Sequence, residues 1–329
     1  MKTNKHLTFS IAAGILIAGV LPLILYRMFF VGVPGFLVDS LHPTLPLHDT
    51  SLFEQWLAVI TAFGVKPAYM ILSLLWIIWL WRQTSPDLVA LRWGLISFLT
   101  GESACAVNYL FFGGLCDFAD YLHNYGMAVS FSFVTYAVLE GLDLHIVKYS
   151  AANDRCAALS LCRSCIKHAD VPCGLRRVFT MLIPASIAVA FMPLCASLRT
   201  VSYDTNIFDS LQHYSSPLSC QWFESRYCVW LALLLLSASW LVLVLKREDP
   251  VGRAKVLFAA AMGPLSFGLM RLFLRAAYSD DLVWSNVWEE LTELIFVTAT
   301  GFVLWVFRRG LFREASAPTG GPDAQPAPA

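Results

Sequence analysis

Residues 228–245 read CVWLALLLLSASWLVLVL, a run without a charged side chain, and Lys246 and Arg247 follow it directly. A helix of about twenty apolar residues is long enough to cross the roughly 30 Å hydrocarbon core of a bilayer. The segment is therefore typical of a membrane-spanning helix that ends at a basic boundary.

Similar apolar runs recur along the chain. Apolar residues make up 57% of the 329 residues, charged residues make up only 14%, and the mean hydropathy is +0.63. A soluble domain of this size needs more charge to cover its surface. We predict an all-α integral membrane protein, a bundle of about eight transmembrane helices. The predicted spans lie near residues 8–30, 57–81, 93–113, 125–142, 178–198, 228–245, 256–275 and 283–307.

The basic residues predict that both termini lie in the cytoplasm. In this topology the cytoplasmic segments contain 17 of the 23 Lys and Arg residues, and the outer loops and the spans contain three each. Because cytoplasmic loops carry an excess of Lys and Arg, we expect this orientation in the inner (plasma) membrane of a bacterium. The cytoplasmic set is Lys2, Lys5, Arg82, Arg92, Lys148, Arg155, Arg163, Lys167, Arg176, Arg177, Lys246, Arg247, Arg253, Lys255, Arg308, Arg309 and Arg313. The first span is too long for a signal-peptide core and fits a retained signal anchor.

The spans form one predicted transmembrane domain, residues 1–313, with a Cys-rich cytoplasmic loop at 143–177 and an outer loop at 199–227. The Pro/Ala/Gly-rich tail 314–329 is predicted to be disordered. These loops leave no room for a separate soluble catalytic domain, and no nucleotide-binding or hydrolase motif is present. The net charge is zero, so no basic field would recruit nucleic acid. The expected partners are the lipid bilayer and a cytoplasmic or membrane protein at loop 143–177.

The cytoplasmic loop contains Cys156, Cys162, Cys165 and Cys173. Cytoplasmic thiols stay reduced, so these four residues could ligate zinc or an iron–sulfur cluster in a tetrahedral site. Unliganded or reversibly oxidised thiols are the main alternative, and lipidated cysteines are another.

Ionisable residues also lie at membrane depth. Lys66, Glu102 and Glu293 fall near the middle of their predicted spans, while Arg271 and Glu289 lie closer to the outer face. A charge at the bilayer centre costs about 2.5–3.5 kcal/mol, so such residues usually face the bundle interior and pair.

The last span presents a polar stripe. Asn286, Glu290 and Glu293 share one helix face, and Glu289 lies one turn before Glu293. Three carboxylates so close predict either a proton or cation path or a set of ion pairs. The expected pairs are Arg271 with Glu290 and Lys66 with Glu102, with hydrogen bonds from Asn108 and Tyr109. Glu140, near a cytoplasmic span end, is expected to reach the headgroups.

Histidines and cysteines on the outer side give two further expectations. His42, His48, His123 and His213 are predicted to lie outside the spans, where they could bind metal or sense pH. Cys220 and Cys228 are the expected pair for a disulfide in an oxidising periplasm.

The leading functional hypothesis is translocation of a proton, ion or small polar solute. Glu102, Glu290 and Glu293 would be the binding or relay carboxylates, with Glu289, Lys66, Arg271 and Asn108 around them. One alternative is a membrane-embedded redox or biosynthetic component with a metal or iron–sulfur site in the cysteine loop. A second alternative is a non-catalytic anchor or assembly subunit.

Overall fold

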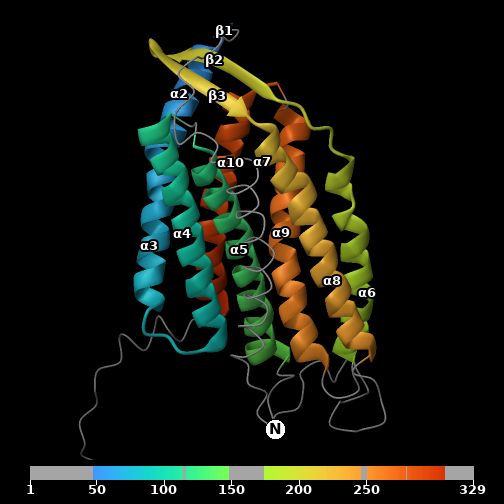
Figure 1. The fold of residues 1–329 in the computed structure, drawn as a ribbon. Coiled ribbons are helices and arrows are strands. Elements are labelled where there is room, and N and C mark those ends of the chain that lie inside the picture. Colours follow the sequence, from blue (N-terminus) through green and yellow to red (C-terminus); the bar gives the residue numbers. More distant parts are fainter. Residues whose placement is uncertain (1–46, 114–115, 148–173, 246–249, 279, 308–329) are drawn as a thin grey trace, which may run out of the picture.

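The computed structural model describes residues 47–113, 116–147, 174–245, 250–278 and 280–307. Long helices run side by side in one bundle, with a small sheet at one end (Figure 1). Within the described residues, six helical segments are long and apolar enough to span a membrane, which makes the chain an integral membrane protein. These segments are Leu52–Leu80, Pro86–Phe112, Asp117–His145, Val178–Cys195, Leu218–Leu245 and Pro250–Tyr278. The predicted span near 8–30 and most of the cysteine loop lie outside the described residues.

The helices follow the predicted spans and mostly extend past them. α10 (Leu282–Phe307) carries the polar stripe and lies in the same bundle as the six apolar segments. The other helices are α2 (Leu52–Ile60), α3 (Lys66–Leu80), α4 (Pro86–Phe112), α5 (Asp117–Leu142), α6 (Gly174–Ala190), α7 (Leu218–Trp222), α8 (Cys228–Leu245) and α9 (Pro250–Tyr278). π-helical turns at Thr61–Val65 and Phe223–Tyr227 join α2 to α3 and α7 to α8, and a third, Asp143–Val147, follows α5. A 3₁₀ turn, Met192–Cys195, follows α6.

A three-stranded sheet covers one end of the bundle (Figure 1). β1 (Leu47–His48) runs parallel to β2 (Val201–Ile207), which pairs antiparallel with β3 (Ser210–Ser216). Phe208 and Asp209 form the turn between β2 and β3, with φ angles of 47° and 63°. Positive φ at both central residues is the condition for a type I′ turn, whose twist suits a hairpin.

Hydrogen bonds fix the sheet to the helices, including those of Phe208 and Tyr203. The Phe208 N–H donates to Gln55 Oε1 on α2 at 3.0 Å. The Tyr203 hydroxyl accepts the N–H groups of Leu282 and Val283, at 2.7 and 3.2 Å, at the start of α10. Burial raises the pKa of Tyr203 above its ordinary value, so this hydroxyl stays protonated at neutral pH.

The helices alternate in direction. The C-terminal ends of α4 and α9 and the N-terminal ends of α5 and α10 all lie at the sheet end (Figure 1). These are the ends that border the predicted outer segments, so the described parts of those segments lie on one side. That this side faces away from the cytoplasm remains an expectation from the charge distribution.

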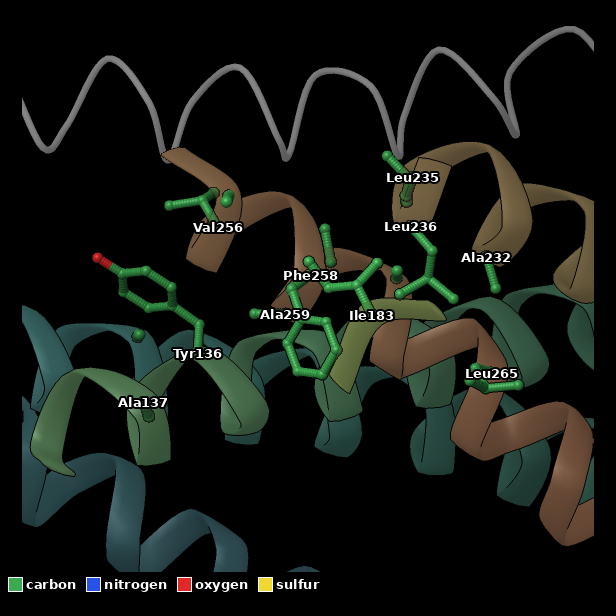
Figure 2. Packing of buried hydrophobic residues seen from close by; sticks show 14 of the residues in the cluster. Tyr136, Ala137, Ile183, Ala232, Leu235, Leu236, Val256, Phe258, Ala259 and Leu265 are labelled. Carbon is green, nitrogen blue, oxygen red and sulfur yellow. The ribbon is translucent and has the colours of Figure 1, made fainter. Parts of the chain in front are cut away.

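The largest apolar cluster of the core includes residues of α3, α4, α5, α6, α8, α9 and α10. Figure 2 shows its part around α5, α6, α8 and α9. Phe179 on α6 meets Phe258 on α9 edge to face, with ring centroids 5.6 Å apart. Ser132 Oγ donates to the Ala260 carbonyl at 3.0 Å, and Ser239 Oγ donates to the Ala254 carbonyl at 2.8 Å. Small polar side chains of this kind hold membrane helices together because lipid offers no other partner.

Candidate functional site

A buried group of charged and polar side chains lies between the helices, in the half of the bundle nearer the sheet. We call it the central cluster. Its members come from α3, α4, α5, α9, α10 and the turn Phe223–Tyr227. They are Lys66, Tyr69, Glu102, His123, Glu224, Arg271, Arg275, Glu289, Glu290 and Glu293.

A glycine contact brings the α4 and α5 members together. A Cβ atom on Gly126 of α5 would lie 2.8 Å from the Gly101 Cα of α4, so the backbones can approach this closely only with glycine. Glu102 follows Gly101, and His123 lies one turn before Gly126. His123 Nδ1 is 3.1 Å from Glu102 Oε1, although the two atoms do not form an aligned hydrogen bond.

Lys66 is the first residue of α3, immediately after a π-helical turn. Turns of this type occur often at functional sites. The Lys66 ammonium lies 2.7 Å from Glu102 Oε2 and 2.8 Å from Glu290 Oε1. The Tyr69 hydroxyl, 3.1 Å from the same ammonium, contacts both carboxylates. The structure therefore contains the Lys66–Glu102 pair and adds Glu290 and Tyr69 to it.

Arg271 on α9 pairs with Glu289, and not with Glu290 as the sequence suggested. Glu289 Oε1 also lies 3.5 Å from His123 Nε2. The Arg271 Nε atom is 3.1 Å from Oε1 of Glu224, which pairs with Arg275 as well. The sequence analysis placed Glu224 in the outer loop 199–227 and counted Arg275, at the end of the predicted span 256–275, with the outer loops, so it missed both.

Glu293 differs from the other acids. Its side chain is 2% exposed, and neither carboxylate oxygen has a hydrogen-bond partner among the described residues. Glu293 nevertheless lies close to Glu102 and His123, since one ligand atom from each of the three falls within 4.8 Å of the others. The central cluster thus contains one buried carboxylate, that of Glu293, which takes no part in its ion pairs.

A cavity of about 350 Å³ leads to the cluster. At the sheet end its walls include Arg199, Ser215 and Tyr278, and at depth they include His123 and Glu289. Counted along α5 at roughly 1.5 Å per residue, His123 lies about 9 Å from the start of the helix. The cavity therefore connects the sheet end with the central cluster.

Other polar residues line or border this cavity. Asp120 and Asn286 lie on its wall. Asn108 donates to Asp120 Oδ1 at 2.6 Å, and Tyr109 donates to Gln212 at 2.8 Å. Neither Asn108 nor Tyr109 has a hydrogen bond to the central carboxylates, so their expected role there is not seen.

An aromatic layer lies one turn beyond the cluster, toward the other end. Phe98 on α4 and Phe131 on α5 both contact Phe296 on α10, with ring centroids 5.5 and 4.9 Å apart. Phe98 and Val297 are fully buried. Because Phe296 and Val297 follow Glu293 by three and four residues, this layer closes the space directly beneath Glu293.

A second buried ion cluster lies past this layer. Lys255 on α9 is 2.5 Å from Glu140 and 3.0 Å from Asp143. Glu140 is 1% exposed, so the expectation that it reaches the headgroups is wrong. A separate cavity of about 140 Å³ is bordered by Asp87 on one side and Phe296 on another.

The structure also corrects two expectations about the outer side. His123 was placed outside the spans, but α5 begins at Asp117 and buries His123 inside the bundle. Cys220 and Cys228 are free thiols and do not form the expected disulfide. They lie eight residues, or about 12 Å, apart along one continuous helical segment, beyond the roughly 7 Å that a disulfide allows between Cα atoms.

The expected metal ligands Cys156, Cys162, Cys165 and Cys173 lie outside the described residues. The chain matches no protein-family model, no curated protein and no solved structure.

Proposed function

We propose that the protein translocates a proton or a small cation across the membrane, with Glu102, Glu290 and Glu293 as the binding carboxylates. The observation that carries the proposal is Glu293, which is buried and has no hydrogen-bond partner among the described residues. Burying an ionised carboxylate in this position costs free energy. Glu293 avoids that cost by taking up a proton or by binding a cation.

Structural ion pairing alone does not account for the cluster. Five carboxylates face three permanent cations in it. The acids are Glu102, Glu224, Glu289, Glu290 and Glu293, and the cations are Lys66, Arg271 and Arg275. The excess of acids supports a centre that takes up positive charge from outside the protein.

The surroundings of the cluster support a path with alternating access. The cavity of about 350 Å³ reaches His123 and Glu289 from the sheet end. On the opposite side, Phe98, Phe131 and Phe296 separate the cluster from the second cavity. Translocation would require this aromatic layer to open after a proton or cation binds, while the first cavity closes.

The test is ion flux in liposomes that contain the purified protein. The wild-type protein should dissipate an imposed gradient of protons, or of a small cation, faster than liposomes without protein. Glu290→Gln should slow this flux, because it removes one binding carboxylate. Asp209→Asn makes the same chemical change in the exposed hairpin turn and should leave the flux unchanged. No flux of protons, Na⁺ or Mn²⁺ with the wild-type protein would refute the proposal.

A further inference from the structure

Three residues of the central cluster converge on one point. Glu102, His123 and Glu293 each offer one ligand atom, and these atoms all lie within 4.8 Å of one another. Their exposed fractions are 0%, 6% and 2%. Both oxygens of Glu293 lack a hydrogen-bond partner among the described residues. Glu102 Oε1 and His123 Nδ1 lie 3.1 Å apart without an aligned hydrogen bond. Buried polar atoms are nearly always paired, so the unpaired carboxylate of Glu293 beside these two atoms indicates a ligand-binding site.

The orientation of His123 fits a metal ligand. Its Nε2 atom lies 3.5 Å from Glu289 Oε1, and Arg271 holds Glu289 in turn. A metal-binding histidine usually directs its other ring nitrogen at a carboxylate, which fixes the tautomer and the ring orientation. With a metal ion bound to Nδ1, the ring proton of His123 would lie on Nε2 and face Glu289 in the same way.

The charge of the cluster fits a divalent ion. A metal ion on Nδ1 would keep His123 neutral, and the five carboxylates and three permanent cations of the cluster would then leave two negative charges for that ion to compensate. Lys66 contacts Oε2 of Glu102, so Oε1 remains available as a ligand. A bound cation would therefore lie between Glu102 and Glu293, at the Oε1 atom of Glu102 and not at the Oε2 atom that Lys66 contacts.

We infer that Glu102, His123 and Glu293 bind a divalent first-row transition-metal ion. One imidazole and two carboxylates suit Mn²⁺, Fe²⁺ or Zn²⁺, and water from the adjacent cavity can supply further ligands. The inference rests on the proposed function, since it names the cation that the same centre would carry.

Mn²⁺ binding to the purified full-length protein tests the site. Mn²⁺ favours oxygen and nitrogen ligands, so it does not report on the cysteine loop. After treatment with a chelator, the wild-type protein should bind about one Mn²⁺ per chain, measured by electron paramagnetic resonance. Glu293→Gln and His123→Gln should each weaken binding by roughly tenfold or more. Glu140→Gln, which alters a buried acid of the second ion cluster, should bind as the wild type does.

A second readout uses only the wild-type protein and does not depend on the folding of a variant. The bound Mn²⁺ should show magnetic coupling to one imidazole nitrogen. The absence of stoichiometric binding, or binding without nitrogen coupling, would overturn the inference.

The same protein separates this inference from the proposed function. Mn²⁺ binding as predicted, with no ion flux in liposomes, would keep the metal site and reject translocation. Proton flux without Mn²⁺ binding would reject the metal site and keep translocation.

Discussion

Glu289 and Glu290 are adjacent on α10, but their carboxylates pair with cations on different helices, Arg271 on α9 and Lys66 on α3. Consecutive helical residues point roughly 100° apart, so the two acids face different neighbours. Glu293 follows them by four and three residues and therefore lies between their directions, without a hydrogen bond to either cation. This geometry leaves one carboxylate without a partner and makes Glu293 the residue on which the account depends.

The pairing of Lys66 predicts a large loss of stability in Lys66→Met. The substitution would leave Glu102 and Glu290 without their common cation, at a cost of about 3–5 kcal/mol for a broken buried pair. The melting temperature in detergent should therefore fall. A second change, Glu290→Gln, should restore part of the loss because it removes one of the two uncompensated charges. A single mutant as stable as the wild type would contradict the observed pairing.

The contact between Gly101 and Gly126 predicts that one added methyl group there lowers the stability of the protein. In Gly126→Ala the new Cβ would lie 2.8 Å from the Gly101 Cα and 2.9 Å from the Ser97 carbonyl oxygen. The helices must separate, and Glu102 must move away from His123. Thermal unfolding should show a lower melting temperature.

Gly252→Ala is the matched control for this change. Gly252 lies on α9, and a Cβ atom there meets no atom within 4 Å. Because alanine favours a helix over glycine by about 0.5–1 kcal/mol, this variant should be as stable as the wild type or more stable. Equal losses in both variants would show that close helix packing is not the cause.

The charge distribution predicts that the sheet end faces away from the cytoplasm. Asp209 in the hairpin turn and Thr84 between α3 and α4 are both exposed and lie at opposite ends of the bundle. In intact cells, a membrane-impermeant thiol reagent should label Asp209→Cys above the wild-type background. It should label Thr84→Cys only after the membrane is opened. The reverse pattern would invert the topology.

The sequence was sufficient to locate most of the bundle, because apolar runs of membrane-spanning length are a direct signal. It also placed Lys66, Glu102 and Glu293 in the interior, since a charge within an apolar run has few other positions available. The sheet at 201–216 was not predicted, although the outer loop that contains it was recognised as long enough to hold structure.

The sequence reasoning failed where a helix continues past the apolar run. His123 lies on α5, and Glu224 lies in the turn that leads into α8, but both were assigned to loops. Hydropathy marks where a helix leaves the lipid and not where it ends. A usable signal was present, because Asp120, His123 and Asn124 follow the helical spacing of three and four residues. Glu140 was misjudged for another reason, since its partner Lys255 lies 115 residues away in the chain.

Glu293→Gln and Glu293→Ala together test the role of Glu293 when melting temperature and ion flux in liposomes are measured on the same preparations. Gln keeps the size of the side chain and mimics a protonated carboxyl group, whereas Ala leaves a cavity in the bundle. We expect that Glu293→Gln melts at the wild-type temperature and loses ion flux, while Glu293→Ala is less stable. A Glu293→Gln protein that unfolds as readily as Lys66→Met, or that transports at the wild-type rate, would contradict this expectation.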